Sequence, residues 1–201
     1  MKNLFKESEF MLGVTKFKNL PEDEGVEILL AGRSNAGKSS ALNALTENPK
    51  LARISKTPGR TTEINYFRVN ETLKFVDLPG YGFARVNAAT RDHWGRLLSH
   101  YCENRQSLRG IFMIVDIRRG LSEYDRNMLF FAKLQSTPIH ILLTKADKVK
   151  RRIANETLKN IELELEKSVT AQLFSSLKRQ GLDQARSVLE DFLNIKRPED
   201  N

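Results

Sequence analysis

The sequence predicts a three-layer α/β fold in which helices cover both faces of a mostly parallel sheet. Short apolar runs rich in branched residues, which indicate buried strands, alternate with segments of helical length. That alternation is typical of crossover units, in which a helix links two parallel strands. A length of 201 residues fits one compact domain.

The expected elements follow one another in a regular order. Strands are placed at residues 26–30, 64–69, 73–76, 111–115, 139–143 and 170–173, with the second as a candidate antiparallel edge. Helices are placed at residues 38–45, 90–101, 124–134, 154–166 and 182–193. The run Ser122-Glu123-Tyr124-Asp125 has the form of a capping box, which supports a helix start at this point.

The chain is expected to have three parts. Residues 1–25 form an N-terminal extension packed on the domain, residues 26–195 form the domain, and residues 196–201 form a frayed polar tail. The segment before Pro21 either adds an edge strand or packs across the sheet. It lacks the features of a signal peptide, and no apolar stretch is long enough to cross a bilayer, so we expect a cytoplasmic protein without a membrane anchor, and a monomer.

Composition excludes some kinds of site and leaves others open. A single cysteine cannot form an internal disulfide, and no Cys/His cluster has the spacing of zinc ligands. The 33 Lys and Arg residues outnumber the 25 Asp and Glu residues, which gives a net charge of +8. This charge favours an anionic partner, but it is equally common on proteins that bind no polyanion.

The most specific motif directly follows the first core strand. Its residues are Gly32-Arg33-Ser34-Asn35-Ala36-Gly37-Lys38-Ser39, which fit the pattern G-x-x-x-x-G-K-[ST] between a strand and a helix. The glycines allow successive amide groups to turn around a phosphate at the positive end of the helix. Lys38 would reach the β and γ phosphates, and the Ser39 hydroxyl would coordinate Mg²⁺. The alternative, a glycine-rich turn that binds nothing, does not account for matches at all four specified positions of an eight-residue pattern in this setting.

A second motif indicates which base is bound. Thr144-Lys145-Ala146-Asp147 follows the expected strand 139–143, so it lies where open α/β sheets bind ligands. The Asp147 carboxylate can accept hydrogen bonds from guanine N1–H and the N2 amine, whereas adenine has no donor at either place. The aliphatic stem of Lys145 can cover the base while its ammonium stays in water.

Three further segments complete the predicted site. Asp77-Leu78-Pro79-Gly80 has the D-x-x-G form, in which Asp77 would hold Mg²⁺ through a water and the Gly80 amide would point at the γ phosphate. From Gly59-Arg60-Thr61-Thr62-Glu63, one hydroxyl could complete the metal shell, and Thr61 is preferred over Thr62. Phe174-Ser175-Ser176 could offer amides to guanine O6, although such a tripeptide is more often an ordinary strand end.

With these five segments in this order, the chain resembles translation-factor-class P-loop GTPases. The runs at 32–40, 56–61 and 77–84 more closely resemble the bacterial EngB (YihA/YsxC) family. The resemblance implies GTP binding and hydrolysis, assistance in assembling the large ribosomal subunit, and a link to normal cell division and septation. It also implies nucleotide contacts at residues 32–39, 59–63, 77–80, 144–147 and 174–176, and Mg²⁺ contacts at Ser39 and Thr61.

The position after Gly80 bears on hydrolysis. Ras-like switches have a glutamine there that orients the attacking water, but this chain has Tyr81. We therefore expect slow intrinsic hydrolysis, with Lys38 and Asn35 as catalytic residues and with acceleration by a partner or an ion. Related GTPases with asparagine at the Asn35 position use it to hold K⁺ beside the phosphates. The alternative is that Asn35 only stabilises the loop.

Two groups of basic residues could contact rRNA phosphates on the large subunit. One lies near Trp94 and the other after the guanine motif; they comprise Arg91, Arg96, Arg105 and Arg109, and Lys145, Lys148, Lys150, Arg151 and Arg152. Charge runs are usually only solvated faces, so this assignment depends on the family resemblance. A GTP-dependent RNA-modifying or metabolic enzyme and an envelope-associated division factor remain as alternative functions.

Overall fold

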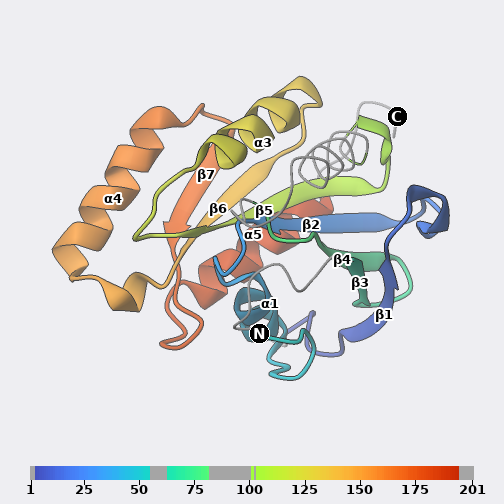
Figure 1. Ribbon diagram of the computed structural model, residues 1–201. Coiled ribbons are helices and arrows are strands. Elements are labelled where there is room, and N and C mark those ends of the chain that lie inside the picture. Colours follow the sequence, from blue (N-terminus) through green and yellow to red (C-terminus); the bar gives the residue numbers. More distant parts are fainter. Residues whose placement is uncertain (1–2, 55–62, 82–100, 102, 195–201) are drawn as a thin grey trace.

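A computed structural model describes residues 3–54, 63–81, 101 and 103–194, and Figure 1 shows their arrangement. The described strands form one seven-stranded sheet in the order β1-β3-β4-β2-β5-β6-β7. Their bounds are β1 Glu9–Val14, β2 Val26–Gly32, β3 Ile64–Arg68, β4 Leu73–Asp77, β5 Leu108–Asp116, β6 Ile139–Thr144 and β7 Val169–Leu173. The pairs β4–β2, β2–β5, β5–β6 and β6–β7 are parallel, whereas β3 pairs antiparallel with both β4 and β1. The predicted fold class is confirmed.

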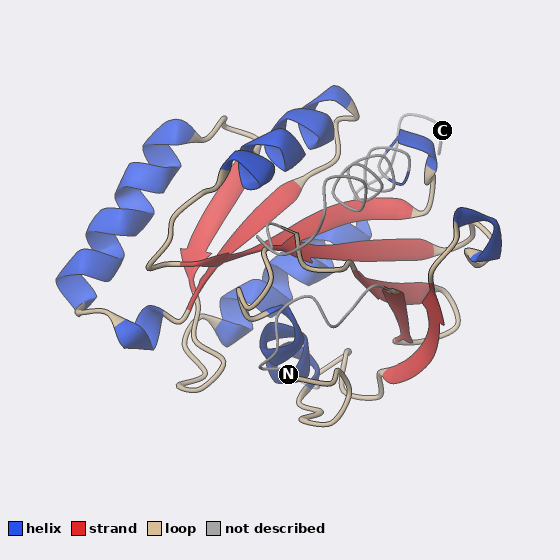
Figure 2. Cartoon of the chain, in the orientation of Figure 1, coloured by secondary structure: helices blue, strands red, loops and turns tan. Residues whose placement is uncertain are grey.

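Helices cover both faces of the sheet (Figure 2). They are α1 Lys38–Thr46, α3 Glu123–Leu134, α4 Arg151–Glu164 and α5 Leu182–Asn194, with short 3-10 turns η1 Phe17–Asn19 and η2 Ala146–Lys148. Alternate residues of β2 explain the two layers. Ile28 and Leu30 pack with α1 and α5, while Leu29 and Ala31 belong to the apolar cluster under α3 and α4. A parallel strand buried on both faces has a continuous apolar run, as β2 does from Ile28 to Ala31.

Most predicted elements are present with small shifts of their ends. β5 begins at Leu108, three residues earlier than expected, and α4 begins at Arg151 because polar Lys and Arg residues form helix as readily as the apolar ones that revealed it. The segment before Pro21 supplies the edge strand β1, one of the two placements left open. The capping box at α3 is present, since the Asp125 carboxylate accepts a hydrogen bond from Ser122 N at 2.7 Å. Of the helix expected at 90–101, only residue 101 is described.

No helix in the described ranges is both long enough and apolar enough to cross a membrane.

A buried polar network lies at the end of the sheet where β2 begins. Glu27 has no exposed surface, and its carboxylate accepts hydrogen bonds from the Tyr101 hydroxyl and from Arg105 Nε and Nη2, the latter two at 3.0 and 2.8 Å. The Tyr66 hydroxyl donates to that of Tyr101 at 3.3 Å. Arg105 was predicted to be one of the arginines that could contact rRNA. This prediction was wrong, because the Arg105 guanidinium binds a buried carboxylate.

The network makes a testable contribution to stability. Arg105→Met is expected to lower the free energy of unfolding by about 3–5 kcal/mol, because it leaves the Glu27 charge buried with only a phenol as partner. Urea denaturation followed by circular dichroism measures this change. The matched control is Arg126→Met, which removes an ion pair whose two side chains are each about half exposed and is expected to cost less than about 1 kcal/mol. Equal losses for the two variants would contradict the assignment.

Candidate functional site

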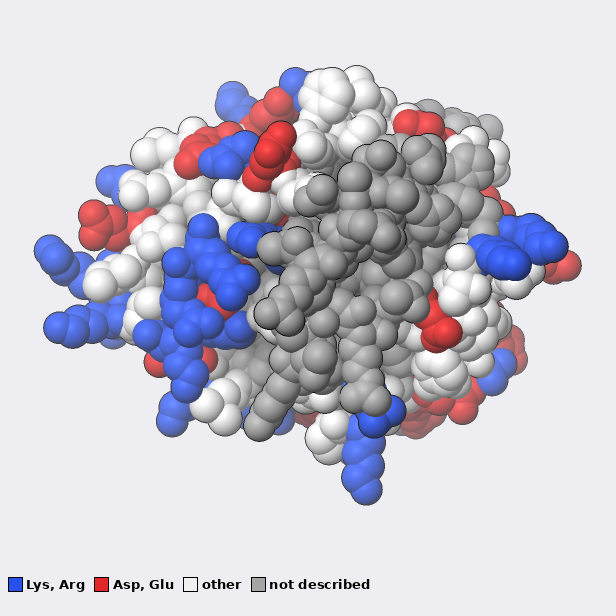
Figure 3. All heavy atoms as spheres, viewed as in Figure 1, with Lys and Arg blue, Asp and Glu red and all other residues white. Residues whose placement is uncertain are grey.

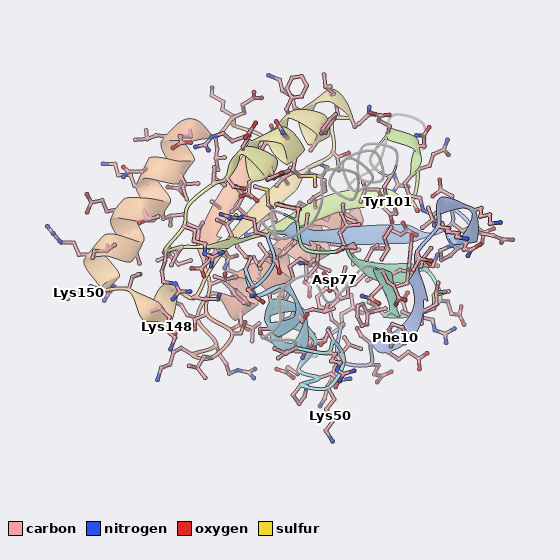
Figure 4. All side chains as sticks on the ribbon, viewed as in Figure 1. Phe10, Lys50, Asp77, Tyr101, Lys148 and Lys150 are labelled. Carbon is pink, nitrogen blue, oxygen red and sulfur yellow. The ribbon has the colours of Figure 1, made fainter. Side chains whose placement is uncertain are left out.

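The site lies at the edge of the sheet where the parallel strands end. β2 leads into the phosphate loop, β4 ends at Asp77, β6 ends at Thr144, and β7 is followed directly by Phe174. Because these strands are parallel neighbours, their carboxyl ends and the segments that follow meet along one edge. Figure 4 labels Asp77 at the end of β4 in the centre of the molecule. Four of the five predicted segments are therefore brought together.

The phosphate loop has the backbone that its glycines predict. Gly37 has φ 109° and caps α1, which begins at Lys38. A side chain at Gly32 would place its Cβ 2.4 Å from the carbonyl oxygen of Ile114, so only glycine allows this close approach to β5. Asn35 has a positive φ of 62°, a region that asparagine enters more easily than most residues. The loop thus presents its backbone at the N-terminus of a helix, where amide groups favour anions.

Lys38 and Asp77 are buried in the site and influence each other's charge. The Lys38 ammonium donates to the Gly32 carbonyl at 3.4 Å, and burial lowers its pKa while the charge of Asp77 raises it. Burial raises the pKa of Asp77 to about 6, although the charge of Lys38 opposes this effect. Asp77 Oδ1 is buried and accepts no hydrogen bond within the described structure. A buried oxygen of this kind calls for a cation or an ordered donor.

The D-x-x-G segment lies directly against the phosphate loop. A Cβ on Gly80 would be 2.7 Å from Ser34 Cα and 3.2 Å from the Lys38 ammonium nitrogen. The Ser34 amide donates to the Tyr81 carbonyl at 3.0 Å. The Tyr81 hydroxyl donates to Asp125 Oδ1 at 2.6 Å, so the side chain is bound to the start of α3. Tyr81 therefore does not reproduce the geometry of a water-orienting glutamine.

The guanine motif is connected to both of its neighbours. The Thr144 hydroxyl donates to the Ala36 carbonyl at 2.6 Å, and the Lys145 ammonium donates to the Asn35 carbonyl at 2.6 Å. Both bonds tie the end of β6 to the phosphate loop. The Ser175 hydroxyl donates to Asp147 Oδ1 at 2.6 Å, and this hydrogen bond lowers the pKa of Asp147. The carboxylate is thus held ionised and in a fixed orientation.

Some predicted residues are placed elsewhere or are not described. Residues 59–62, including Thr61, lie outside the described ranges, as do Arg91, Trp94 and Arg96. Glu63 is exposed and lies against the edge strand, where its Oε2 is 2.5 Å from the position of a Cβ on Gly13. The backbone of Phe174 contacts the guanine motif, because its carbonyl accepts the Ala146 amide at 3.2 Å.

The sequence analysis missed two carboxylates that border the site. Asp116 ends β5 and accepts a hydrogen bond from the Lys145 ammonium at 2.9 Å, while Asp125 binds Tyr81. Asp116 carried a usable signal, because it is a charged residue that directly follows a buried apolar run, as Asp77 does. Asp125 was assigned only to the helix cap, and its second role depends on the fold.

Known proteins resemble this chain over most of its length. A family model described as 50S ribosome-binding GTPase matches residues 27–145, more than half of the chain. The probable GTP-binding protein EngB of Hydrogenovibrio crunogenus is 48% identical over 198 residues, which cover 97% of this chain and 93% of that protein. The corresponding protein of Stenotrophomonas maltophilia is 44% identical over 200 residues, which cover 98% of this chain and all of that protein.

Solved structures show the same fold at lower identity. A crystal structure of a probable GTP-binding protein EngB has a TM-score of 0.69 and 22% identity, and the match covers 84% of this chain and 99% of that one. A structure of Era in complex with MgGDPNP and nucleotides of 16S ribosomal RNA has a TM-score of 0.66 and 19% identity, and the match covers 87% and 59% of the two chains. The full-length similarity to the two bacterial relatives, together with the phosphate loop and guanine motif at one edge of the sheet, shows that this chain belongs to the EngB family of GTP-binding proteins and is a P-loop GTPase.

Proposed function

We propose that this GTPase is a cytoplasmic, monomeric switch that uses GTP and Mg²⁺ to assist assembly of the large ribosomal subunit, with a consequent role in cell division and septation. The observation that carries the nucleotide part is the meeting of four strand-end segments, in which Lys145 joins the guanine motif to the phosphate loop. The ribosomal part is supported by the description of the matching family, 50S ribosome-binding GTPase.

The geometry supports a definite placement of the nucleotide. Phosphates would lie over residues 32–39, with Lys38 beside the β and γ groups and the Gly80 amide nearby. Guanine would lie at Asp147, which Ser175 orients. The stem of Lys145 would cover the base, because its ammonium is held at the Asn35 carbonyl. Residues 59–63, of which only Glu63 lies in the described ranges, would add further nucleotide contacts.

The residues present fit a magnesium ion beside the phosphates. The unpartnered oxygen of Asp77 is a hard acidic ligand, direct or through water, and Ser39 stands next to Lys38 in the first turn of α1. Thr61 would add a second hydroxyl. Among the described residues, no group of three or more His, Cys, Asp or Glu side chains is arranged to hold a metal ion. When bound, the ion would neutralise charge on the β and γ phosphates.

The base-reading assignment is tested by Asp147→Asn. The amide is expected to weaken GTP binding by about tenfold or more and to improve binding of xanthosine triphosphate, whose O2 accepts a hydrogen bond where guanine donates one. Fluorescence titration with labelled nucleotides measures both affinities. Asp183→Asn is the matched control, because this carboxylate at the start of α5 is 99% exposed. An unchanged preference for guanine in Asp147→Asn would show that the base lies elsewhere.

Hydrolysis by the isolated protein is expected to be slow, because the Tyr81 hydroxyl is engaged by Asp125 instead of by a water beside the phosphates. We propose that K⁺ at Asn35 supplies part of the missing charge stabilisation. The Asn35 side chain is exposed at the site, while the Asn35 backbone carbonyl accepts a hydrogen bond from the Lys145 ammonium. Its left-handed backbone also supports the alternative, in which asparagine is present only because it tolerates this conformation.

The two roles of Asn35 predict different ion dependence. If it holds K⁺, GTP turnover should be several times faster in K⁺ than in Na⁺ at equal ionic strength, and Asn35→Asp or Asn35→Ala should change this ratio. Phosphate release is measured with and without ribosomal subunits. Equal turnover in the two ions under both conditions would leave Asn35 with the loop-stabilising role alone.

A basic surface next to the guanine motif supports an RNA partner. Four exposed basic residues lie between the end of η2 and the first residues of α4: Lys148, Lys150, Arg151 and Arg152. Figure 3 shows Lys and Arg side chains gathered on this side of the molecule, beside the site, and Figure 4 shows Lys150 extending into solvent. Of these four cations, only Lys148 has an ion pair within the described structure, at 3.5 Å from Asp147. Phosphates of rRNA would complement this charge.

Co-sedimentation with large ribosomal subunits tests the partner. The protein is expected to pellet with the subunit when bound to a non-hydrolysable GTP analogue, less so with GDP, and progressively less as salt rises. Lys150→Glu with Arg151→Glu should reduce pelleting strongly. Lys16→Glu with Lys18→Glu, the same charge change beside β1, should reduce it much less.

Other outcomes would redirect the assignment. Absence of binding in every nucleotide state would contradict the ribosomal role and favour a GTP-dependent enzyme acting on RNA or a metabolite. Cofractionation with membranes instead of ribosomes would favour an envelope-associated division factor.

A further inference from the structure

Asp116 is a buried carboxylate that neither a motif nor a known role accounts for. It ends β5, is 3% exposed, and accepts hydrogen bonds on both oxygens. Oδ1 accepts the backbone amide and Nε of Arg118 at 3.1 and 2.9 Å. Oδ2 accepts Arg118 Nη2 at 2.7 Å and the Lys145 ammonium at 2.9 Å. One carboxylate therefore holds two cations from different segments.

Lys145 is fixed at both ends by this arrangement. Its backbone has φ 59°, a strained value for a lysine, which turns the chain sharply after β6. Its ammonium bridges Asp116 and the Asn35 carbonyl of the phosphate loop, at 2.9 and 2.6 Å. The four-carbon stem of Lys145 must then run from its fixed backbone to its bound ammonium. Without the carboxylate, the ammonium would keep one neutral acceptor and would be free to turn into water.

The charge on Asp116 is built into the site. Burial alone raises its pKa, but the hydrogen bonds from Arg118 and Lys145 hold the pKa well below the usual range of an aspartate. The carboxylate thus stays ionised at any pH at which the protein works. A buried charge is strongly destabilising without partners, so the ionised Asp116 also keeps Lys145 in place.

We propose that Asp116 is a positioning residue for guanine nucleotides: it fixes the Lys145 side chain across the base position and so prepares the site before the nucleotide arrives. The inference rests on the proposed placement of guanine beside Asp147. Preorganisation of this kind improves affinity by reducing the number of side chains that binding must order. Since the base end is common to GDP and GTP, both ligands should gain equally.

The competing explanation is purely structural. Arg118 donates three of the four hydrogen bonds that the Asp116 carboxylate accepts. The carboxylate could therefore serve only to stabilise the turn after β5. In that case loss of the charge would destabilise the turn whatever residue stood at position 145. The two explanations differ in whether the effect of Asp116 on nucleotide binding depends on Lys145.

A double-mutant cycle separates them. Asp116→Asn is expected to weaken binding of labelled GDP and of a non-hydrolysable GTP analogue by the same factor, about tenfold, the size expected for one charge-assisted hydrogen bond. In a Lys145→Met background the same change should cost less than about twofold, because there is no ammonium left to position. Arg118→Ala, which retains the contact of Asp116 with Lys145, should leave GDP affinity within about twofold of the unmodified chain.

Several results would overturn the proposal. These are an Asp116→Asn variant that binds GDP as the unmodified chain does, an equal loss in the two backgrounds, or an Arg118→Ala variant that loses as much affinity as Asp116→Asn. If Asp116→Asn does not fold, Asp116→Glu replaces it in the test, because this variant retains the charge and shifts the carboxylate by one methylene. A smaller loss of nucleotide affinity is then expected, and this loss should again depend on Lys145. Failure here with a normal change of base preference in Asp147→Asn would reject only the positioning role.

Discussion

The parallel sheet imposes the constraint on which the site depends. β2, β5 and β6 are buried on both faces, so their middles admit almost only apolar side chains. The polar groups of the site therefore lie where the strands end, and the parallel arrangement puts those ends on one edge. The phosphate loop, Asp77, Asp116 and the guanine motif all follow this rule. The parallel sheet thus brings the phosphate-binding and base-binding groups of four separate chain segments to one edge.

This constraint also explains why so much of the fold and of the site is readable in the sequence. A largely apolar run followed by a glycine or a polar residue marks both a buried strand and a polar position at its end. Residues 73–76, which lead to Asp77, and residues 139–143, which lead to Thr144, have this form, and each was identified from local residues. The sheet order is less accessible, because the pairing of β1 with β3 depends on residues separated by about fifty positions in the chain.

The contacts that sequence analysis missed are those made between segments. Arg105 was grouped with surface arginines, yet Glu27 holds it in the interior, since a buried carboxylate on a central strand requires a cation. Tyr81 was identified as the residue that stands where related switches have a catalytic glutamine. Its hydrogen bond to Asp125 was not foreseen, because it depends on α3 lying beside the D-x-x-G segment. In each case the residue type was noticed and its partner was not, because the partner is distant in the chain and adjacent only after folding.

Asp116 shows how register converts such distance into a specific contact. β5 and β6 pair in parallel with Asp116 opposite Thr144, so the residue after Thr144 emerges beside the carboxylate. A shift of one position would point the carboxylate to the other face and leave Lys145 without its anchor. The apolar residues that set this register, Ile111 to Val115 opposite Ile139 to Leu143, are far from any ligand. Core packing therefore determines where the Lys145 ammonium lies, and through it how the phosphate loop and the base-reading motif are held together.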